Sequence, residues 1–394
     1  MAERTCYQGG TLLIGDSLQP VDDMALVVEG ERILSIGAPD PNARPVDLSG
    51  KLVCPMFINS HCHLGDTGLK ELGVNLKMEK VLNPPEGLKH RYLSGLKPEM
   101  HQEMMRHGLV EMLQNGIIAC ADFREQGLAG VRALRQAAAG LPIRAVILGR
   151  MDESASPQQI EAEAHALMQE ADGIGVRDAG SYDPQMLKRI RAAYPQRILA
   201  AHAAERRAAE QESFAETGRG QAQRTLEWGP DFLVHLVHSP DEELRLLAEQ
   251  GVAAVACPRS NGILGDGLPN LAKWHRLGLT IALGSDNVMF CSPDMTREMD
   301  YASRLVRGLE ESTTCLDTQA VLQAATIGGA RALKLDDRLG SLAAGKEASF
   351  IVFDARRANL TYVHDWVSAV VHRATVADIE RVVVAGKDLR EYAV

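Results

Sequence analysis

The chain has 394 residues, of which 45% are hydrophobic, so it is long enough to bury a large core and exceeds one ordinary domain. A formal net charge of −10 at pH 7 argues against a nucleic-acid-binding protein, which normally presents a basic surface. No run approaches the roughly 20 apolar residues that a membrane-spanning helix needs, so we expect no membrane partner.

The amino-terminal segment lacks the cationic stretch followed by an apolar stretch that is typical of a signal peptide. The chain contains 7 cysteines, an odd number without regular spacing. Together these features predict a cytoplasmic protein with reduced thiols.

Short strands and turns are predicted at both ends of the chain. Apolar segments at 11–14 and 24–37 lie near the beginning, and the turn Glu29-Gly30-Glu31 inside the second predicts a hairpin. The segments 340–354 and 379–387 likewise consist of short apolar runs separated by turn residues. We therefore expect residues 1–51 and 340–394 to pair into one small β-sandwich module beside a central domain of residues 52–339.

Eight apolar segments of the central part predict buried parallel strands, because they are bounded by turn residues and alternate with helical patterns such as 98–113. Strands are expected at 53–59, 117–123, 143–149, 173–176, 198–202, 232–237, 252–257 and 279–284. The segment 64–97 is expected to be a long loop over the barrel mouth. This order predicts the α/β class and a (β/α)8, TIM-like barrel.

Side chains that bind metals follow four of these predicted strands. His61 and His63 lie two residues apart, so both imidazoles can point the same way from a strand end, although a solvated pair is the alternative. Three further apolar runs lead into such side chains, at His202 with Glu205, at His235 with His238, and at Asp286 with Asn287. Function collects at the carboxyl ends of parallel strands in α/β folds, so these groups define the candidate site.

These motifs resemble those of the amidohydrolase superfamily, and most closely its cytosine deaminase and chlorohydrolase-like branch. The resemblance spans nearly the whole chain and rests on Pro55-Met-Phe-Ile-Asn-Ser-His61-Cys-His63, His202-Ala-Ala-Glu205, His235, Gly284-Ser-Asp286-Asn287 and the tail 340–354. Met56 stands where relatives usually have glycine. The resemblance implies one divalent metal ion, Zn²⁺ with Fe²⁺ or Mn²⁺ as alternatives, held by His61, His63, His202 and Asp286.

A single ion is expected because relatives with two ions need a carboxylated lysine at the end of the fourth strand, and residues 173–180 contain no lysine. Three neutral imidazoles and one carboxylate leave a position open for water on a five-coordinate ion.

Catalytic roles are expected for three residues. Glu205 lies three residues after His202, where it can act as a proton shuttle, and a salt bridge to Arg206 or Arg207 is the alternative. His235 is expected to orient the water or polarise the bond under attack. Asp286 is expected to accept the proton of the water as well as bind the metal. We expect His238 to face the other way and to pack or support a ligand.

Basic side chains occur where the loops of the barrel mouth are predicted. The expected substrate-binding residues are His90, Arg91, Arg124, Arg150, Arg259 and Asn287. Guanidinium groups bind carboxylates bidentately, so this gathering predicts an anionic substituent on a small-molecule substrate. The alternative is that each arginine pairs with a local acid such as Glu125. Aromatic residues make up only 4% of the chain, which disfavours a stacked purine pocket.

The expected activity is hydrolytic deamination, or displacement of another heteroatom, at an amidine-like carbon of a small nitrogen heterocycle, by metal-bound hydroxide with Glu205 as proton shuttle. One alternative is the opening of a cyclic amide ring, as in imidazolonepropionase-like relatives. A second is a non-catalytic metal-binding sensor, against which the intact ligand set argues. A homodimer is expected only from the family resemblance.

Overall fold

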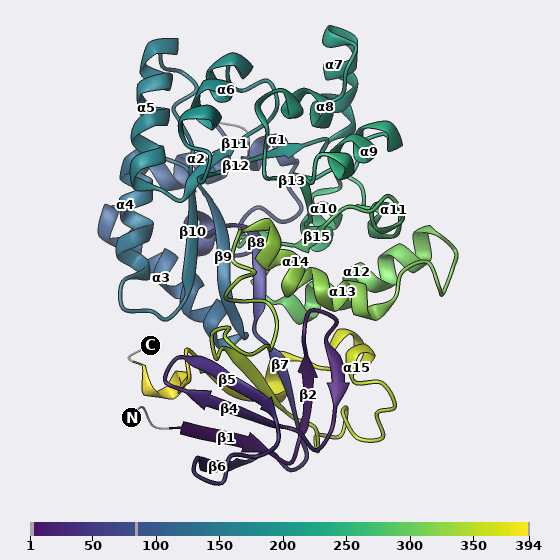
Figure 1. Cartoon of the computed structure of the whole chain (residues 1–394). Coiled ribbons are helices and arrows are strands. Elements are labelled where there is room, and N and C mark those ends of the chain that lie inside the picture. The colour runs from purple at the N-terminus through teal and green to yellow at the C-terminus, as the bar shows by residue number, and fades with distance from the viewer. Residues whose placement is uncertain (1–3, 83–85, 393–394) are drawn as a thin grey trace.

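The computed structural model describes residues 4–82 and 86–392. Figure 1 shows a barrel with its surrounding helices in the upper part of the view, and the sheets built from both ends of the chain in the lower part. None of the helices in these ranges is both long and apolar enough to span a membrane.

The barrel is one nine-stranded sheet in which every neighbouring pair is parallel. Its order is β15-β14-β13-β12-β11-β10-β9-β8-β16. The strands are β8 Phe57–His63, β9 Ile117–Arg124, β10 Arg144–Gly149, β11 Gly173–Val176, β12 Ile198–Ala203, β13 Phe232–His235, β14 Ala253–Ala256, β15 Ile281–Leu283 and β16 Asp286–Asn287. The two outermost strands, β15 and β16, are successive pieces of one segment, so the sheet closes on itself and the expected (β/α)8 barrel is confirmed.

The eighth barrel strand is interrupted, whereas the sequence predicts one strand at 279–284. Gly284 packs against the chain at His61, and a Cβ atom on Gly284 would lie 2.8 Å from the Cβ atom of His61. The next residue is held by Asn59, whose Oδ1 accepts a hydrogen bond of 2.9 Å from the backbone N–H of Ser285. This close approach divides the strand and places Asp286 next to β8.

The expected first barrel strand, at 53–59, is wrong in its bounds, because two strands of different sheets share this apolar run. Strand β7, Lys51–Pro55, pairs with β17, Phe350–Asp354, and with β2, Thr11–Ile14, outside the barrel. After Met56 the chain enters the barrel as β8. All residues from 51 to 63 are buried, so hydrophobicity alone could not show the change of sheet.

Helices follow the barrel strands and cover the outside of the sheet (Figure 1). They are α3 Pro98–Gln114, α4 Gly127–Ala138, α5 Pro157–Glu170, α6 Pro184–Ala193, α7 Arg207–Thr217, α8 Gln221–Thr225, α9 Asp241–Glu249, α10 Pro258–Leu264, α11 Leu271–Arg276, α12 Met295–Leu309, α13 Thr318–Ala324 and α14 Ile327–Ala332. The helix expected at 98–113 is α3. Local chemistry fixes several beginnings: Ser156 and Gln159 form a capping box at α5, whose first residue is a proline.

The segment 64–97, expected to be a loop, contains short helices in its described part. A 3₁₀ turn spans Leu64–Leu69, and α1 Met78–Leu82 and α2 Leu88–Ser94 follow. Buried polar contacts hold the segment on the barrel, since Asp66 accepts hydrogen bonds from the side chain of Asn287 at 2.8 Å and from the backbone N–H of Met289 at 3.1 Å.

Both chain ends contribute to the lower sheets. A four-stranded sheet has the order β5-β4-β1-β6, and a six-stranded sheet has the order β19-β18-β17-β7-β2-β3. The remaining strands are β1 Arg4–Gln8, β3 Gln19–Val21, β4 Ala25–Glu29, β5 Arg32–Gly37, β6 Arg44–Asp47, β18 Ile379–Val384 and β19 Lys387–Asp388. The expected hairpin is β4 and β5, with Gly30 at φ 59° in its turn.

Residues from both sheets share a hydrophobic core that includes Leu26, Val53 and Phe350. One C-terminal element instead covers barrel helices: α15, Trp366–His372, bonds α12 through His372 and Asp300, whose Nδ1 and Oδ1 are 3.0 Å apart. We propose that the terminal module and the barrel are two domains. Because 51–55 pairs with β17 and β2, this segment belongs to the module.

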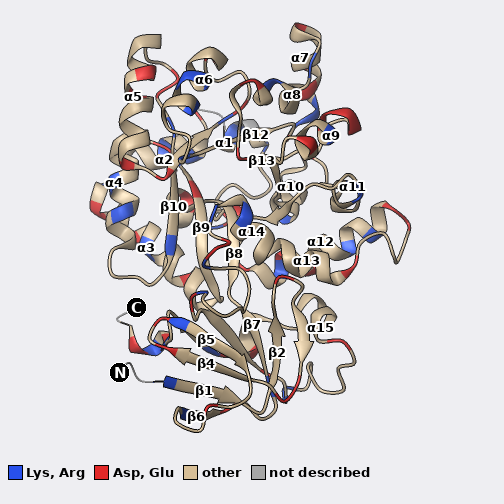
Figure 2. Ribbon diagram, viewed as in Figure 1, with Lys and Arg blue, Asp and Glu red and all other residues tan. Residues whose placement is uncertain are grey.

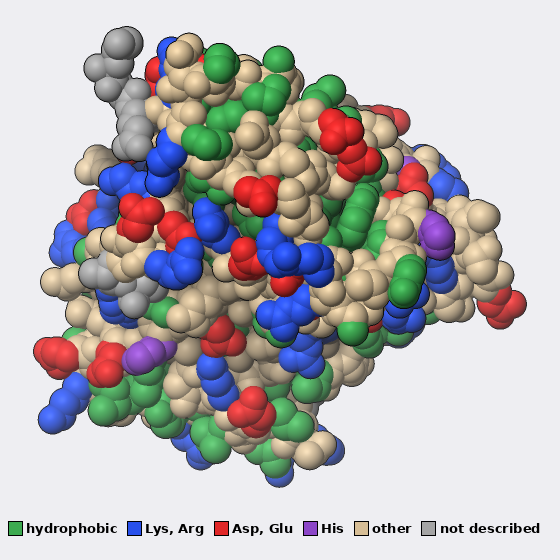
Figure 3. All heavy atoms as spheres, turned by 90° about the horizontal axis from the view of Figure 1, so that it is seen from below, with side chains coloured by type: hydrophobic (Ala, Val, Ile, Leu, Met, Phe, Trp, Pro, Cys, Tyr) green, Lys and Arg blue, Asp and Glu red, His purple; other side chains and the backbone are tan. Residues whose placement is uncertain are grey.

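Charged residues are spread over the outer helices and loops (Figure 2). On the face seen from below, basic and acidic side chains are interspersed with apolar ones (Figure 3). Many of them form ion pairs, such as the one between Arg4 and Glu29 at 2.8 Å.

Candidate metal centre and active site

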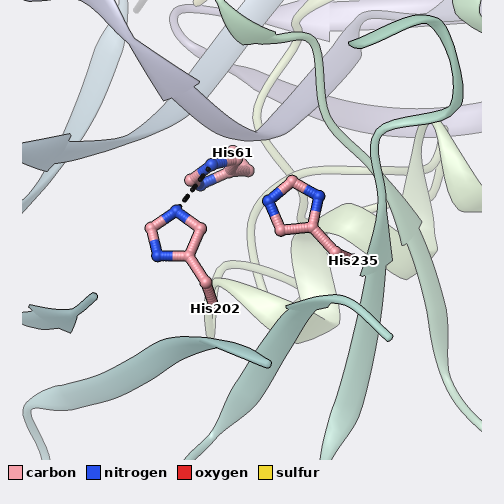
Figure 4. Close-up of side chains that lie close together, drawn as sticks. All are labelled: His61, His202 and His235. Carbon is pink, nitrogen blue, oxygen red and sulfur yellow. Dashed lines mark hydrogen bonds between the residues drawn. The ribbon is translucent and has the colours of Figure 1, made fainter. Parts of the chain in front are cut away.

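Four histidines meet at the carboxyl ends of barrel strands. His61 and His63 come from β8, His202 from β12 and His235 from the last position of β13. Figure 4 shows three of these rings facing one another, with a dashed line between the Nε2 atoms of His61 and His202, which are 3.3 Å apart. The rings of His202 and His235 are stacked, with centroids 5.4 Å apart and planes 17° apart.

The carboxylate of Asp286 faces the same cluster. Its Oδ1 atom lies 3.3 Å from Nε2 of His61 and 3.5 Å from Nε2 of His63. Its Oδ2 atom accepts a hydrogen bond of 2.6 Å from the hydroxyl of Ser260. This bond turns one oxygen away and leaves Oδ1 directed at the histidines.

Polar groups outside the cluster lie near the Nδ1 atoms of three of the rings. Nδ1 of His202 is 3.3 Å from the backbone oxygen of Val176, and Nδ1 of His63 is 3.5 Å from Oε1 of Glu125. Nδ1 of His235 faces the side-chain amide of Asn261. Contacts at Nδ1 leave each Nε2 available to the cluster, as is usual for histidines that bind metals.

Burial and neighbouring groups set the protonation states of His61, His202 and Asp286. Desolvation lowers the pKa of His61 to about 4 and holds the pKa of His202 well below its ordinary value. Burial alone would raise the pKa of Asp286, but the hydrogen bond to His61 and the nearby histidines hold it well below the ordinary value. Neutral imidazoles and an ionised carboxylate are the forms that bind divalent cations.

The donor atoms lie close enough together to share an ion. Three sets have all their ligand atoms within 4.8 Å of one another: His61 with His63 and Asp286, His61 with His202 and His235, and Glu205 with His235 and Asp286. The geometry therefore offers His235 as a ligand as well as a residue that orients water. Imidazole nitrogen and carboxylate oxygen suit Zn²⁺ and related divalent ions, so the residues fit such a group.

Several backbones at the site are in the left-handed region. His235 has φ 77°, Asp286 has φ 60°, and Ala204, between His202 and Glu205, has φ 49°. Non-glycine residues rarely adopt this region, and such strain concentrates at functional sites. At His235 it ends β13, which the sequence predicts to continue to residue 237. His238 lies beyond this turn, with Nε2 2.6 Å from the backbone oxygen of Asp266.

Glu205 lies at the open side of the cluster. Its Oε1 atom is 3.6 Å from Nε2 of His235, and its side chain is 27% exposed. Among residues 4–82 and 86–392, Glu205 lies within ion-pair distance of His235 but not of Arg206 or Arg207.

A cavity of about 160 Å³ opens beside the cluster. His63, His202, Glu205, His235 and Asp286 line it on one side. Met78, Leu82, Ala203 and Ala209 supply its apolar wall. Among the lining residues of the described chain there is no Phe, Tyr or Trp.

Three of the expected substrate-binding residues line this cavity: His90, Arg150 and Asn287. The Nε2 atom of His90 is 2.9 Å from the backbone oxygen of Leu82, and burial lowers the pKa of this imidazole. Arg150 is 3.4 Å from Glu153. Each of the three therefore already has a protein partner.

The other three expected residues lie elsewhere. Arg91 is exposed on α2. Arg124 is fully buried behind the cavity, where it pairs with Asp122 and Glu125. Arg259 binds Glu298 at 3.3 Å and backbone oxygens of the segment before α12. For Arg124 and Arg259, pairing with an acid of the chain is the alternative that the structure shows.

Three more cationic residues line the cavity: Lys89, which stands beside His90 among the basic residues of the predicted mouth loop, and Arg177 and Arg206, which the sequence did not single out as binding residues. Lys89 is buried between Asp66 and Glu125, at 3.1 and 3.0 Å. Arg177 directly follows β11, so the rule that function collects after strand ends would have found it. Arg206 follows Glu205.

The model of the amidohydrolase family matches residues 52–389. The chain belongs to the amidohydrolase family. This amidohydrolase is a hydrolytic enzyme that acts on C–N bonds, as the motifs predict.

Two curated relatives illustrate the branch. A putative aminohydrolase of Methanothermobacter thermautotrophicus is 37% identical over 308 residues, which cover 76% of this amidohydrolase and 80% of the relative. A 5-methylthioadenosine/S-adenosylhomocysteine deaminase of Halobacterium salinarum is 28% identical over 414 residues, covering 99% and 93%.

Solved structures share the fold. An adenosine deaminase from Xanthomonas campestris with bound zinc superposes with a TM-score of 0.87 at 22% identity, covering 98% of this amidohydrolase and 94% of that chain. An atrazine chlorohydrolase from Arthrobacter aurescens TC1 complexed with zinc gives a TM-score of 0.84 at 21% identity, covering 98% and 94%.

Proposed function

We propose that this amidohydrolase is a metal-dependent deaminase of small nitrogen heterocycles. In the reaction, water replaces an amino group on an amidine-like ring carbon and ammonia leaves. The observation that carries the proposal is the convergence of His61, His63, His202 and Asp286 beside a cavity that Glu205 also lines. The names of the relatives, an aminohydrolase and a deaminase, support the choice of reaction.

His61, His63, His202 and Asp286 would hold one divalent ion. The zinc named in two structures of the same fold favours Zn²⁺. When bound, such an ion supplies Lewis acidity, which makes water acidic enough to yield a nucleophile near neutral pH.

Proton transfer is assigned to Glu205. Its carboxylate lines the cavity next to His235, so it can take one proton from water and deliver it to a ring nitrogen, and then carry the second proton of the same water to the amino group, which leaves as ammonia. His235, held at Nδ1 by the amide of Asn261, directs Nε2 toward Glu205 and orients the water.

The test is product analysis with metal-replete protein and a panel of aminated pyrimidines, triazines, purines and pterins. We expect ammonia release in step with substrate loss and a product whose ring is intact, with a hydroxyl or oxo group in place of the amine. A product with a new carboxylate and an opened ring would replace deamination by the cyclic-amide alternative. Absence of turnover across the panel would overturn the proposal.

A further inference from the structure

The cavity carries cationic side chains that the proposed chemistry does not use. Lys89, Arg150, Arg177 and Arg206 line it, and the lining carboxylates are Glu125, Asp178, Glu205 and Asp286. The two sets balance in number. Asp66 and Glu153 add two carboxylates beside Lys89, Arg150 and Arg177, so the preference for a substrate charge depends on which of the four cations lacks an acid of its own.

Three of these cations are engaged by the protein. Lys89 is buried between Asp66 and Glu125. Arg177 is bound by Glu153, with contacts from 2.7 to 3.0 Å, and by Asp178 at 3.0 Å. Arg150 shares Glu153 at 3.4 Å. These side chains help to form the wall of the cavity, but acids of the protein already accept most of their hydrogen bonds.

Arg206 differs from them. In the described ranges of the chain, no acid lies within ion-pair distance of its guanidinium group, and no hydrogen bond engages that group. The side chain is half-buried and lines the cavity next to Glu205. The charge of Arg206 acts on Asp266 without a direct contact. Burial raises the pKa of the Asp266 carboxyl to about 7, and Arg206 is one of the groups that oppose this rise.

The surroundings of Arg206 also suit an anion. Arg206 precedes the first residue of α7, and no side chain caps this helix, whose first-turn residue Ala209 lines the cavity. The start of a helix favours negative charge. The lining has few apolar side chains, which suits a small polar ligand better than a large apolar one.

We infer that Arg206 binds an anionic oxygen group of the substrate, a carboxylate or a phosphate, so that the enzyme selects small anionic heterocycles over neutral ones. The inference rests on the proposed function, because it names the substrate class of the same site. A guanidinium group whose donors are free presents a planar fork that matches either oxyanion bidentately.

The experiment compares matched substrates in kcat/KM. The pairs are pterin with pterin-6-carboxylate and adenosine with adenosine 5′-phosphate. The proteins are metal-replete wild type, Arg206→Met and Arg207→Met. Arg207 is the matched control, since it is adjacent and exposed but does not line the cavity.

We expect wild type and Arg207→Met to prefer an anionic member by about tenfold to a hundredfold, the range of a hydrogen-bonded charge. Arg206→Met should lose this preference, because kcat/KM for the anionic member falls far more than kcat/KM for the neutral member. Preference within the pterin pair identifies a carboxylate, and preference within the adenosine pair identifies a phosphate.

Equal rates within both pairs, or an anion preference that survives in Arg206→Met, would overturn the inference. The second result would point to direct binding of the anion to the metal. If no compound releases ammonia, the proposed function fails separately. Calorimetric affinities of the same pairs for the same three proteins then decide the inference, with equal affinities counting against it.

Discussion

The acid–base chemistry of the site depends on single side chains, and Glu205 is the first to test. Glu205→Gln keeps the size of the side chain and removes the group that moves protons. We expect kcat to fall by about 10² to 10⁴, while metal content measured by mass spectrometry stays the same. Glu212→Gln, an exposed change on α7, is the control and should be fully active. Loss of metal in Glu205→Gln would make this residue a ligand.

Glu125 is expected to position a ligand rather than to react. Burial alone would raise its pKa, but Lys89 and Arg124 hold the pKa well below the ordinary value, so it faces His63 as a carboxylate. We expect Glu125→Gln to weaken metal binding by about 10- to 100-fold, the usual effect of removing such a partner.

Competition with a chromophoric chelator measures the metal affinity of each variant. Glu111→Gln, which removes an exposed ion pair with Lys70, is the control. Unchanged metal affinity with a raised KM would assign Glu125 to the substrate instead. Glu125→Gln removes one ion-pair partner of the buried Lys89. A thermal melt of each variant therefore checks that the protein is still folded.

The sequence was enough to predict which metal-binding side chains lie at the strand ends. It was not enough to predict which charged side chains pair with one another. The candidate ligands stand directly after apolar runs, so the periodicity of the sequence was enough to bring them together. Arg124 and Arg206 are the same residue type in similar positions, yet one is buried on acids and the other lines the cavity. That difference depends on neighbours distant in sequence, which spacing does not reveal.

At the scale of elements, helices α7 and α9 bury two acids around the turn that begins α8. Glu210 accepts a hydrogen bond of 2.9 Å from the backbone N–H of Gln221, and Glu243 accepts one of 2.7 Å from that of Gly220. Burial raises the pKa of Glu210 to about 7, with Glu243 adding to the shift, and burial raises the pKa of Glu243 as well.

This pair predicts how stability changes with pH. The folded state holds a proton on Glu210 up to about pH 7, whereas the unfolded chain releases it near the ordinary value of 4.5. The folded state therefore loses stability as pH rises between these values. Glu210→Gln removes the loss, and we expect it to unfold at higher urea than wild type at pH 8, by about 1–2 kcal/mol.

The gain should shrink at pH 5, where the folded wild type holds this proton and the unfolded chain has regained part of it. Glu212→Gln, exposed on the same helix, should show no such dependence. A constant difference between wild type and Glu210→Gln at both pH values would contradict the assignment of a buried proton to Glu210.

The bounds of elements were predictable where burial is one-sided. The helix α3 was recognised because its buried face recurs at helical spacing. The segments β7 and β8 were not separated, because both are buried on all sides and only Met56 lies between them. The short helices of 64–97 were also missed, since a helix of five to seven residues leaves little periodicity to detect.

For the whole molecule, the metal should contribute to stability, because its candidate ligands come from three strands at distant places in the sequence. An ion present at a thousandfold above its Kd stabilises the folded state by about 4 kcal/mol. We therefore expect dialysis against a chelator to lower Tm by several degrees, and zinc to restore it.

Asp286→Asn is the variant that checks this explanation, because it should lower Tm in zinc-containing buffer and abolish the response to the chelator. If wild type melts at the same temperature with and without zinc, these residues do not hold a tightly bound ion.

The architecture as a whole followed from the order of strands and helices, and so did the use of both chain ends in a second set of sheets. The contact that joins the eighth strand to the first did not follow from that order. It depends on Gly284 lying against His61, a packing relation between two residues more than two hundred positions apart. α15 likewise lies on the barrel helices although its sequence belongs to the C-terminal part.

Met56 is the single link between a strand of the lower sheets and the strand that bears His61 and His63. A link of one residue has no slack, so any tilt of those sheets is transmitted as a displacement of two imidazoles. The lower sheets therefore help to fix the positions of His61 and His63, and we expect that replacing these sheets with a foreign domain would lower activity even with every side chain of the cavity retained.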